Sequence, residues 1–392
     1  MTKKKLFLFI GLAFLAMAPS FVLWAPFYFR FETVWGIPIA TEGMQTVVSN
    51  YDGPLYIVIA KTFYNLTAIA QNFSFPLPLE YYAAHFPLYP LIIAILGQLT
   101  GYPWGMLFAT QLSAVFATIM FYLLVKEKIG KKYALWFTFV FTLFPARWLI
   151  VKAVGSPEPL FVGAIIASIY YFDKKNYWLA GIFGAIAQLV KSPGILLFVA
   201  YGLTIIMPRL NDLRKEHSLS VEKWVRRLQW RAYPVMLIPV ALVSVFFLFK
   251  SPSTFNNFYA YFNSGDNIHL FFPPFQIFNY QQPWVNTHWL EEILFIYMLS
   301  AVGLIALFKK YSESAMTWFT AIFLISVIFV SHRDIMRYSL PILPFLFIGY
   351  SDFLKRPEAK LVIAFLFIPT FLFALAFISS NAMPISDWTP FL

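Results

Sequence analysis

The stretch "LFLFIGLAFLAMAPSFVLW", residues 6–24, runs without a charged residue for the length that a membrane-spanning helix needs. Similar apolar stretches recur along the 392-residue chain, which is 60% hydrophobic and only 12% charged. A soluble domain is about half apolar and about a quarter charged, so this composition indicates an integral membrane protein. The spans are expected to be helices, because lipid offers the backbone no hydrogen-bond partners. No clear cleavage site follows Trp24, so the first stretch is expected to remain as a helix.

We predict an all-α polytopic membrane protein that forms one transmembrane domain over residues 1–392. In the long first outer loop, residues 26–102, two apolar stretches are too short or too interrupted to span, and we predict helices at the membrane interface there. About eleven transmembrane helices are predicted, at residues 6–25, 103–125, 133–151, 158–172, 177–190, 194–208, 232–249, 290–308, 315–330, 337–352 and 361–379.

Basic residues set the expected orientation. Most of the 29 lysines and arginines fall into segments that a cytoplasmic N-terminus places inside, including the basic loop 209–231. The positive-inside rule therefore predicts an inward N-terminus and an outward loop at 250–289, in the plasma membrane if the source is prokaryotic. The net charge of +11 is explained by this orientation and by anionic lipid, so we expect contact with membrane lipid and no nucleic-acid partner. Few cations, Arg147 among them, lie on the outer side.

Several kinds of catalytic site are excluded by the residue types present. The chain has no cysteine, which rules out disulfides, thiolate metal sites and thiol catalysis. No phosphate-cradling glycine loop and no HExxH motif occurs, so nucleotide hydrolysis and zinc proteolysis have no support. The 5 histidines show no metal-ligand spacing. We therefore expect neither a cofactor nor a bound metal.

Polar residues gather in stretches that all face outward in this topology. Asp52 at the first of them is suited to take a proton from an incoming hydroxyl. Lys191, Arg333 and Arg337 are suited to hold a phosphate, since ammonium and guanidinium groups are the usual anion ligands. With a membrane groove for a long isoprenoid chain, these groups indicate sugar transfer from a lipid phosphate. The stretches are "NYDGPLY" (50–56), "HFPLYP" (85–90), "VGSPEPLF" (154–161) with "LVKSPG" (189–194), and "HRDIMRYSLPILP" (332–344).

Five short motifs in these stretches resemble, in order, those of the GT-C glycosyltransferases. The resemblance is to the mannosyltransferases related to GPI mannosyltransferase 2, the PIG-V type. The sequence departs from their pattern in the second proline of "SPEP", in a lysine for arginine in "KSPG", and in shorter outer loops. The motifs are "YDGPLYIVIA" (51–60), "FPLYP" (86–90), "SPEPLF" (156–161), "KSPG" (191–194) and "RYSLPILP" (337–344).

The resemblance implies a GT-C fold and an inverting transferase. Such an enzyme moves mannose from a polyprenyl- or dolichyl-phosphate donor to a lipid or glycan acceptor on the outer or lumenal face. It implies Asp52 as the catalytic base, and Lys191 and Arg337 as ligands of the donor phosphate. Enzymes of this type often work with a small membrane partner subunit, and the short outer loops of this chain leave room for one. Candidate contacts to the sugar or acceptor are His85, Tyr51, Tyr89, Glu158 and Tyr338.

Other interpretations stay open. Asp-Gly-Pro is good turn chemistry, so Asp52 has an alternative role as a turn-capping carboxylate. Lys191 has an alternative role as a helix-end lysine that reaches the headgroups. Glu158 has one as a partner of Lys191 or as an acid that caps a helix start. Arg333 and Arg337 have one as partners of Asp334 or of another outer acid. For the whole protein, the alternatives are a lipid transporter or flippase, and another lipid-phosphate enzyme, such as a phosphatase or a transferase of undecaprenyl-linked aminoarabinose.

Overall fold

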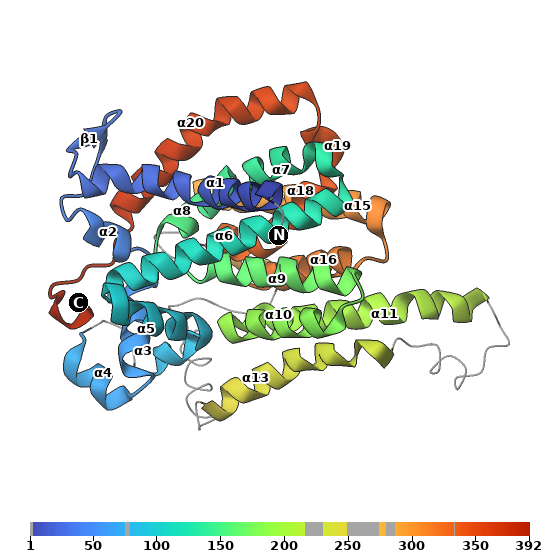
Figure 1. The fold of residues 1–392 in the computed structure, drawn as a ribbon, viewed down its shortest axis with the longest axis horizontal. Coiled ribbons are helices and arrows are strands. Elements are labelled where there is room, and N and C mark those ends of the chain that lie inside the picture. The colour runs from blue at the N-terminus through green and yellow to red at the C-terminus, as the bar shows by residue number, and fades with distance from the viewer. Residues whose placement is uncertain (1–2, 75–78, 216–229, 249–273, 280–286, 333) are drawn as a thin grey trace. The chain divides into compact units, whose positions relative to one another are not determined.

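The structure is a computed structural model that describes residues 3–74, 79–215, 230–248, 274–279, 287–332 and 334–392. Helices make up almost all of this part of the chain (Figure 1). Within it, the only strands are a two-residue antiparallel pair, β1 (Thr33–Val34) and β2 (Ile37–Pro38). The predicted all-α class is confirmed.

The chain divides into two compact units. The first unit holds the described residues of Met1–Gly163 and Phe353–Leu392, and the second holds those of Ala164–Leu248 and Tyr259–Asp352. The prediction of one transmembrane domain is not tested by this division and stays a prediction.

The described helices are divided between the two units as follows. The first unit contains α1 (Lys3–Tyr28), α2 (Met44–Val48), α3 (Gly53–Thr62), α4 (Leu66–Asn72), α5 (Leu88–Thr100), α6 (Tyr102–Lys128), α7 (Lys131–Leu143), α8 (Ala146–Ala153) and α20 (Pro357–Ser380), with 3₁₀ helices at Leu79–Ala84 and Thr389–Phe391. Helices α9 (Glu158–Asp173) and α19 (Ser351–Leu354) run from one unit into the other. The second unit contains α10 (Tyr177–Val190), α11 (Leu196–Lys215), α13 (Leu237–Leu248), α15 (Thr287–Tyr311), α16 (Ala315–Ile328), α17 (Ile335–Tyr338) and α18 (Leu343–Gly349), with 3₁₀ helices at Ser192–Ile195, Trp230–Met236, Gln276–Asn279 and Leu340–Ile342.

Each predicted span coincides with helical structure, but the helices differ in length. Among the described residues, 5 helices are long and apolar enough to cross a membrane alone: α1, α6, α20 and the segments Trp230–Leu248 and Leu290–Tyr311. Others, such as α10 and α16, have 14 residues each. The protein is therefore an integral multi-pass membrane protein, as predicted. The count of about eleven crossings and the orientation stay predictions.

One predicted span, residues 133–151, is not a continuous helix. Helices α7 and α8 are bent by 73° relative to each other. Phe144 is extended because it precedes Pro145, and the residue before a proline disfavours the helical conformation. The bend leaves carbonyl groups at the end of α7 without partners in the helix. The fully buried Lys152 of α8 donates a hydrogen bond to one of them, the carbonyl of Thr142.

The long first loop contains short helices, as predicted. Helices α3, α4 and α5 lie within residues 26–102. Helix α5 has 13 residues, which at about 1.5 Å per residue gives about 20 Å. This length is less than the roughly 30 Å of hydrocarbon that a span must cross, so α5 is too short to be a span by itself.

Helix α6 is the centre of the first unit, and α1, α5, α7 and α8 pack against it (Figure 1). The approach of α5 to α6 is close because both helices carry a glycine at the contact. A Cβ atom at Gly105 of α6 would lie 2.6 Å from the backbone nitrogen of Gly97 in α5. This glycine pair therefore sets the spacing of the two helices.

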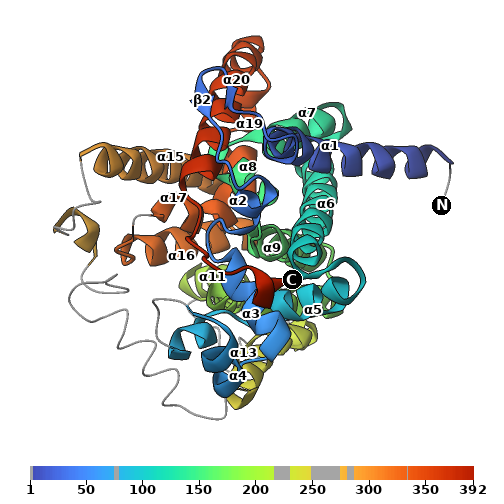
Figure 2. The same cartoon turned by 90° about the vertical axis from the view of Figure 1, so that its left-hand side faces the viewer.

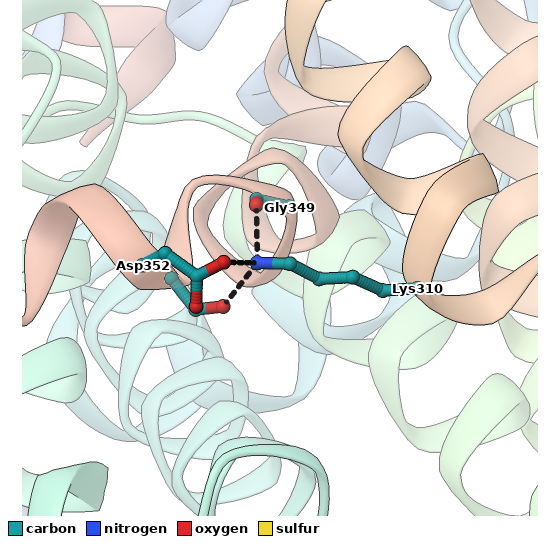
Figure 3. A network of polar contacts seen from close by, with 4 residues as sticks. Lys310, Gly349 and Asp352 are labelled. Carbon is teal, nitrogen blue, oxygen red and sulfur yellow. Dashed lines mark hydrogen bonds and ion pairs between the residues drawn. The ribbon is translucent and has the colours of Figure 1, made fainter.

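In the second unit, α15 and α18 make a similar close contact. A Cβ atom at Gly349 would lie 2.6 Å from the carbonyl oxygen of Gly303. Lys310, near the end of α15, donates hydrogen bonds to the carbonyl of Gly349 at 3.1 Å and to the hydroxyl of Ser351 at 2.9 Å (Figure 3). It also lies 2.9 Å from a carboxylate oxygen of Asp352. Because that carboxylate is largely exposed, the ion pair contributes little, and the main effect of Lys310 is to cap the end of α18.

Replacing Gly105 with alanine is expected to push α5 away from α6 and to lower the stability by about 1–3 kcal/mol. The measurement is thermal unfolding of the purified protein in detergent. Gly11→Ala in α1 is the control, because a Cβ atom there meets nothing within 4 Å and alanine favours a helix more than glycine does. Equal melting temperatures for the two variants would contradict the close approach.

Candidate functional site

A tight turn joins α2 to α3 and carries Asp52. Tyr51 takes a left-handed backbone conformation, with φ 50°. A Cβ atom at Gly53 would lie 2.6 Å from the carbonyl oxygen of Val48, so glycine is the residue that fits there without a backbone shift. Pro54 then starts α3 with a backbone angle that suits a helix. The sequence Tyr-Asp-Gly-Pro therefore forms its turn locally, as predicted.

Asp52 stands at the N-cap position of α3 and is half-buried. An N-cap carboxylate usually accepts a hydrogen bond from an amide of the first helical turn. The side chain of Asp52 makes no such capping hydrogen bond. The alternative of a helix-capping carboxylate is therefore not what the structure shows, and the role of Asp52 as a base stays a prediction.

The proline box "FPLYP" packs against α3 through aromatic rings. The ring of Tyr56 lies edge-on to those of His85 and Tyr89, with centroids 4.9 Å and 5.0 Å away. Both His85 and Tyr89 are buried, and the hydroxyl of Tyr64 donates a hydrogen bond to the carbonyl of His85. The structure therefore brings the box and the helix that follows Asp52 together.

The "SPEP" segment is tied to the same cluster through Thr110 of α6. The hydroxyl oxygens of Thr110 and Tyr89 lie 2.7 Å apart, and the backbone N–H of Ser156 donates to Thr110 Oγ1 at 3.2 Å. Ser156 in turn donates its hydroxyl hydrogen to the carboxylate of Glu158. Glu158 is buried in the first turn of α9, where an acid is favoured. One threonine thus joins two of the predicted motifs.

Met106 of α6 fills the space between the Asp52 turn and the segment before Ser156. A Cβ atom at Gly53 would lie 3.2 Å from Met106 Cε, and one at Gly155 would lie 2.3 Å from it. The flexible thioether therefore occupies the volume that two glycines leave. Two motifs that are about a hundred residues apart in the sequence meet at this side chain.

Arg147 of α8 belongs to this cluster, but the sequence analysis did not predict it as a site residue. Its Nη1 donates a hydrogen bond to the hydroxyl of Tyr51 at 3.1 Å, and its guanidinium lies 4.1 Å from the ring centre of Phe377. Only 4% of the side chain is exposed. An arginine shortly after a proline inside an apolar stretch is the one feature of the sequence that could have marked Arg147 as a candidate. The sequence does not show that Tyr51 is its neighbour.

The predicted phosphate ligands belong to the second unit. Lys191 follows the last residue of α10 in an extended conformation and is half-buried. Arg337 of α17 is buried, and Tyr338 beside it is half-buried with its ring 4.9 Å from that of His332. Arg333 lies outside the described residues. The predicted base and the predicted phosphate ligands are therefore in different units, and their roles stay predictions.

Burial disfavours the ionised form of the phenols around the proline box. It raises the pKa of Tyr64 and of Tyr82 well above the usual value for tyrosine. Burial likewise lowers the pKa of Lys61 at the end of α3, because it disfavours the charged form. At neutral pH the two tyrosines are therefore hydrogen-bond donors. Within the described part of the chain, no three His, Asp or Glu side chains are grouped to hold a metal ion.

An apolar cavity of about 240 Å³ lies in the first unit between α1, α7, α8 and α20. Thr370 is the one polar residue in its lining. The face of α20 that carries Thr370 also carries Phe373 and Phe377, since positions three and seven residues apart share a helix face. These two rings lie 5.9 Å and 4.1 Å from the guanidinium of Arg147. The face of α20 thus leads from the cavity to Arg147 and Tyr51.

Replacing Thr110 with valine is expected to leave the amide of Ser156 without this acceptor and to remove the partner of the Tyr89 hydroxyl. We expect a loss of stability about 1–3 kcal/mol larger than for Thr118→Val. Thr118 is the matched control, because it is also fully buried in α6 but bonds only to the carbonyl of Ala114 in its own helix. Thermal unfolding of both variants is the measurement, and equal losses would argue against the interhelical role of Thr110.

No protein-family model matches the sequence, and no curated protein matches it. Two crystal structures of ArnT from Cupriavidus metallidurans are similar in fold. The structure bound to undecaprenyl phosphate has a TM-score of 0.57 and 13% identity, over 94% of this chain and 64% of ArnT. The apo structure has a TM-score of 0.54 and 14% identity, over 91% of this chain and 62% of ArnT. The chain thus spans less than two thirds of the length of ArnT, and what it shares with ArnT is the GT-C fold that the sequence motifs predicted.

Proposed function

We propose that this protein is an inverting membrane glycosyltransferase that moves mannose from a polyprenyl-phosphate donor to a hydroxyl group of a lipid or glycan acceptor. The observation that carries the proposal is the GT-C fold, which the chain shares over 94% of its length with ArnT bound to undecaprenyl phosphate. A polyprenyl phosphate is the lipid that such a donor releases. The fold therefore supports a polyprenyl-phosphate-linked donor, and the motif resemblance to PIG-V enzymes supports mannose as the sugar.

Asp52 is the proposed base of the reaction. The acceptor hydroxyl oxygen forms a bond to the anomeric carbon on the face opposite the phosphate, and the carbon–oxygen bond to the phosphate breaks. Asp52 takes the hydroxyl proton, and the bonding electron pair leaves with the polyprenyl phosphate. Support comes from the tight turn, which places Asp52 at the start of α3 and leaves it half-buried. The neighbouring Tyr51, Tyr89, His85 and Glu158 are the proposed contacts to sugar or acceptor.

Two sets of cations have proposed roles near the substrates: one as ligands of the leaving phosphate, the other in orienting Tyr51. Arg337 and Lys191 are proposed as ligands of the phosphate by the motif resemblance, and Arg333 by its guanidinium group. The burial of Arg337 supports this because a water-poor site strengthens a cation's hold on an anion. Arg147 is the cation that the structure adds beside Tyr51. Its hydrogen bond to Tyr51 favours a role in orienting that residue. In this proposal the fixed cations supply the electrostatic stabilisation, and no metal is required.

The membrane arrangement completes the proposal. The lipid chain of a substrate is proposed to occupy apolar surface such as the cavity beside α20, whose lining is almost entirely carbon. The reaction takes place on the extracytoplasmic side, as the distribution of basic residues indicates. A small membrane partner subunit is part of the proposal on the motif resemblance alone.

Replacing Asp52 with asparagine is expected to lower sugar transfer by a factor of about 10²–10⁴, the usual contribution of a general base. The assay is transfer of radiolabelled mannose from polyprenyl phosphate by the purified protein in nanodiscs, with the total lipid extract of the source organism as acceptor. Binding of undecaprenyl phosphate should be unchanged, since the carboxylate does not hold the phosphate.

The matched control for this experiment is Glu42→Gln, an exposed carboxylate of the same unit that accepts a hydrogen bond from the hydroxyl of Thr41. It should transfer sugar at the wild-type rate. Full activity of the Asp52 variant would refute its role as base. Donors that carry other sugars are tested beside mannose, and transfer from one of them alone would keep the reaction and replace the sugar.

Replacing Arg337 with glutamine is expected to weaken the binding of undecaprenyl phosphate by at least about tenfold, because a hydrogen bond to a charged group is worth about 1.5–3 kcal/mol. Arg147→Gln is expected to lower turnover more than binding. The dissociation constants are measured by thermophoresis, with the exposed Arg356→Gln as control. The reverse order of the two effects would assign the phosphate to Arg147.

A further inference from the structure

Asn50, two residues before Asp52, is fully buried and uses both hydrogens of its side-chain amide. Its Nδ2 donates to the carbonyl oxygen of Thr46 at 2.8 Å and to that of Ile378 at 2.9 Å. The first carbonyl belongs to the end of α2, and the second to the last turn of α20. Such carbonyls have no partner within their own helix. One side chain therefore caps the ends of two helices that are far apart in the sequence.

The backbone around Asn50 is held by the same part of the chain. Asn50 and Ala382 form an isolated antiparallel bridge. The amide of Met383 donates to the carbonyl of Ser49 at 2.7 Å, and Asn381 Nδ2 lies 3.5 Å from Asn50 Oδ1. The residues just after α20 thus add a short strand-like partner to the residues just before the Asp52 turn.

These contacts reach Asp52 through its two neighbours. On one side, the amide of Gly53 donates to the carbonyl of Asn50 at 3.2 Å. On the other, the ring of Tyr51 packs on that of Phe377, with centroids 5.5 Å apart. Asp52 therefore lies between two residues whose positions depend on α20 and the segment after it.

The chain after Met383 makes a second attachment, at the far end of α3. Lys61 Nζ donates to the carbonyl oxygens of Pro390 at 2.7 Å and of Leu392 at 2.9 Å. The buried ring of Phe391 lies 5.2 Å from that of Phe73, which follows α4. The C-terminal segment consequently lies along α3 (Figure 2). Both ends of α3, the helix that starts after Asp52, therefore contact the C-terminal segment.

We propose that residues 377–392 form a clamp that holds the Asp52 turn in its catalytic position, and that Asn50 is the positioning residue through which this clamp acts. The catalytic part of this inference rests on the proposed function. Without the clamp, α3 would still form from its own sequence, but the direction of Tyr51 and Asp52 would no longer be fixed.

The test uses Asn50→Asp, which keeps the shape of the side chain and removes both amide hydrogens. Its carboxyl group then faces two carbonyl oxygens, so the contact to Ile378 is lost. The first readout is hydrogen exchange of the protein in nanodiscs. Peptides that cover residues 49–56 and 378–385 should exchange at least tenfold faster than in the wild type, whereas peptides of α6 should not change.

The second readout is transfer kinetics per molecule of folded protein. We expect kcat to fall at least tenfold with the donor KM within twofold of the wild-type value, because the base is displaced while donor binding persists. A merely structural role would lower the folded fraction and leave kcat per folded molecule unchanged. Asn72→Asp is the control, since Asn72 donates only to Ala68 in its own exposed helix turn.

Met383→Pro is the second variant, for the case that Asn50→Asp does not fold. It removes the amide hydrogen that bonds to Ser49 and restricts its own φ angle and the backbone of Ala382, and it should change both readouts in the same direction. Unchanged exchange in the folded variants would overturn the clamp, and faster exchange with wild-type kcat would overturn its positioning role. If the wild type transfers sugar from none of the donors, the proposed function fails, and hydrogen exchange alone then supports or overturns the clamp.

Discussion

The face of α6 that carries Met106 and Thr110 is the constraint on which the first unit depends. These residues are one turn apart, so they point in the same direction. Met106 fills the gap beside Gly53 and Gly155, and Thr110 bonds to Tyr89 and Ser156. The Asp52 turn, the proline box and the "SPEP" segment all contact this one face. Adding or removing one methyl group on this face is expected to shift the packing of all three segments, because protein interiors are close-packed.

Three buried polar side chains of the first unit find partners at helix ends or on aromatic rings. Lys152 bonds to a carbonyl at the end of α7 that the bend leaves without a partner in its helix. Asn50 bonds to carbonyls of α2 and α20. Arg147 bonds to a phenol and lies over a phenyl ring. A polar group in a low-dielectric interior is costly unless it finds such partners. The helix breaks of this protein therefore provide the places where polar side chains can be buried.

The first unit by itself assembles groups of complementary chemistry. It brings together the carboxylates of Asp52 and Glu158, the guanidinium of Arg147, the imidazole of His85 and several phenols whose ionised form burial disfavours. A base needs its pKa and its direction set by neighbours. For the proposed base Asp52, the nearby residues Tyr51 and Asn50 make contacts to α8 and α20, which lie about a hundred and more than three hundred residues further along the chain. In this proposal, the distant segments act on the site by orienting it.

The sequence by itself determined the membrane class, the helical segments and the local turn at Asp52. Each follows from short-range physics: the length of an apolar stretch, the need to satisfy the backbone in lipid, and the conformations of Gly53 and Pro54. It also indicated the proline box and the "SPEP" segment as parts of one site. Only the tertiary structure decided that Arg147 lies against Tyr51 and that Asn50 caps α20. These contacts join residues far apart in the chain, and packing of the complete helices sets which carbonyl or ring lies next to each polar side chain.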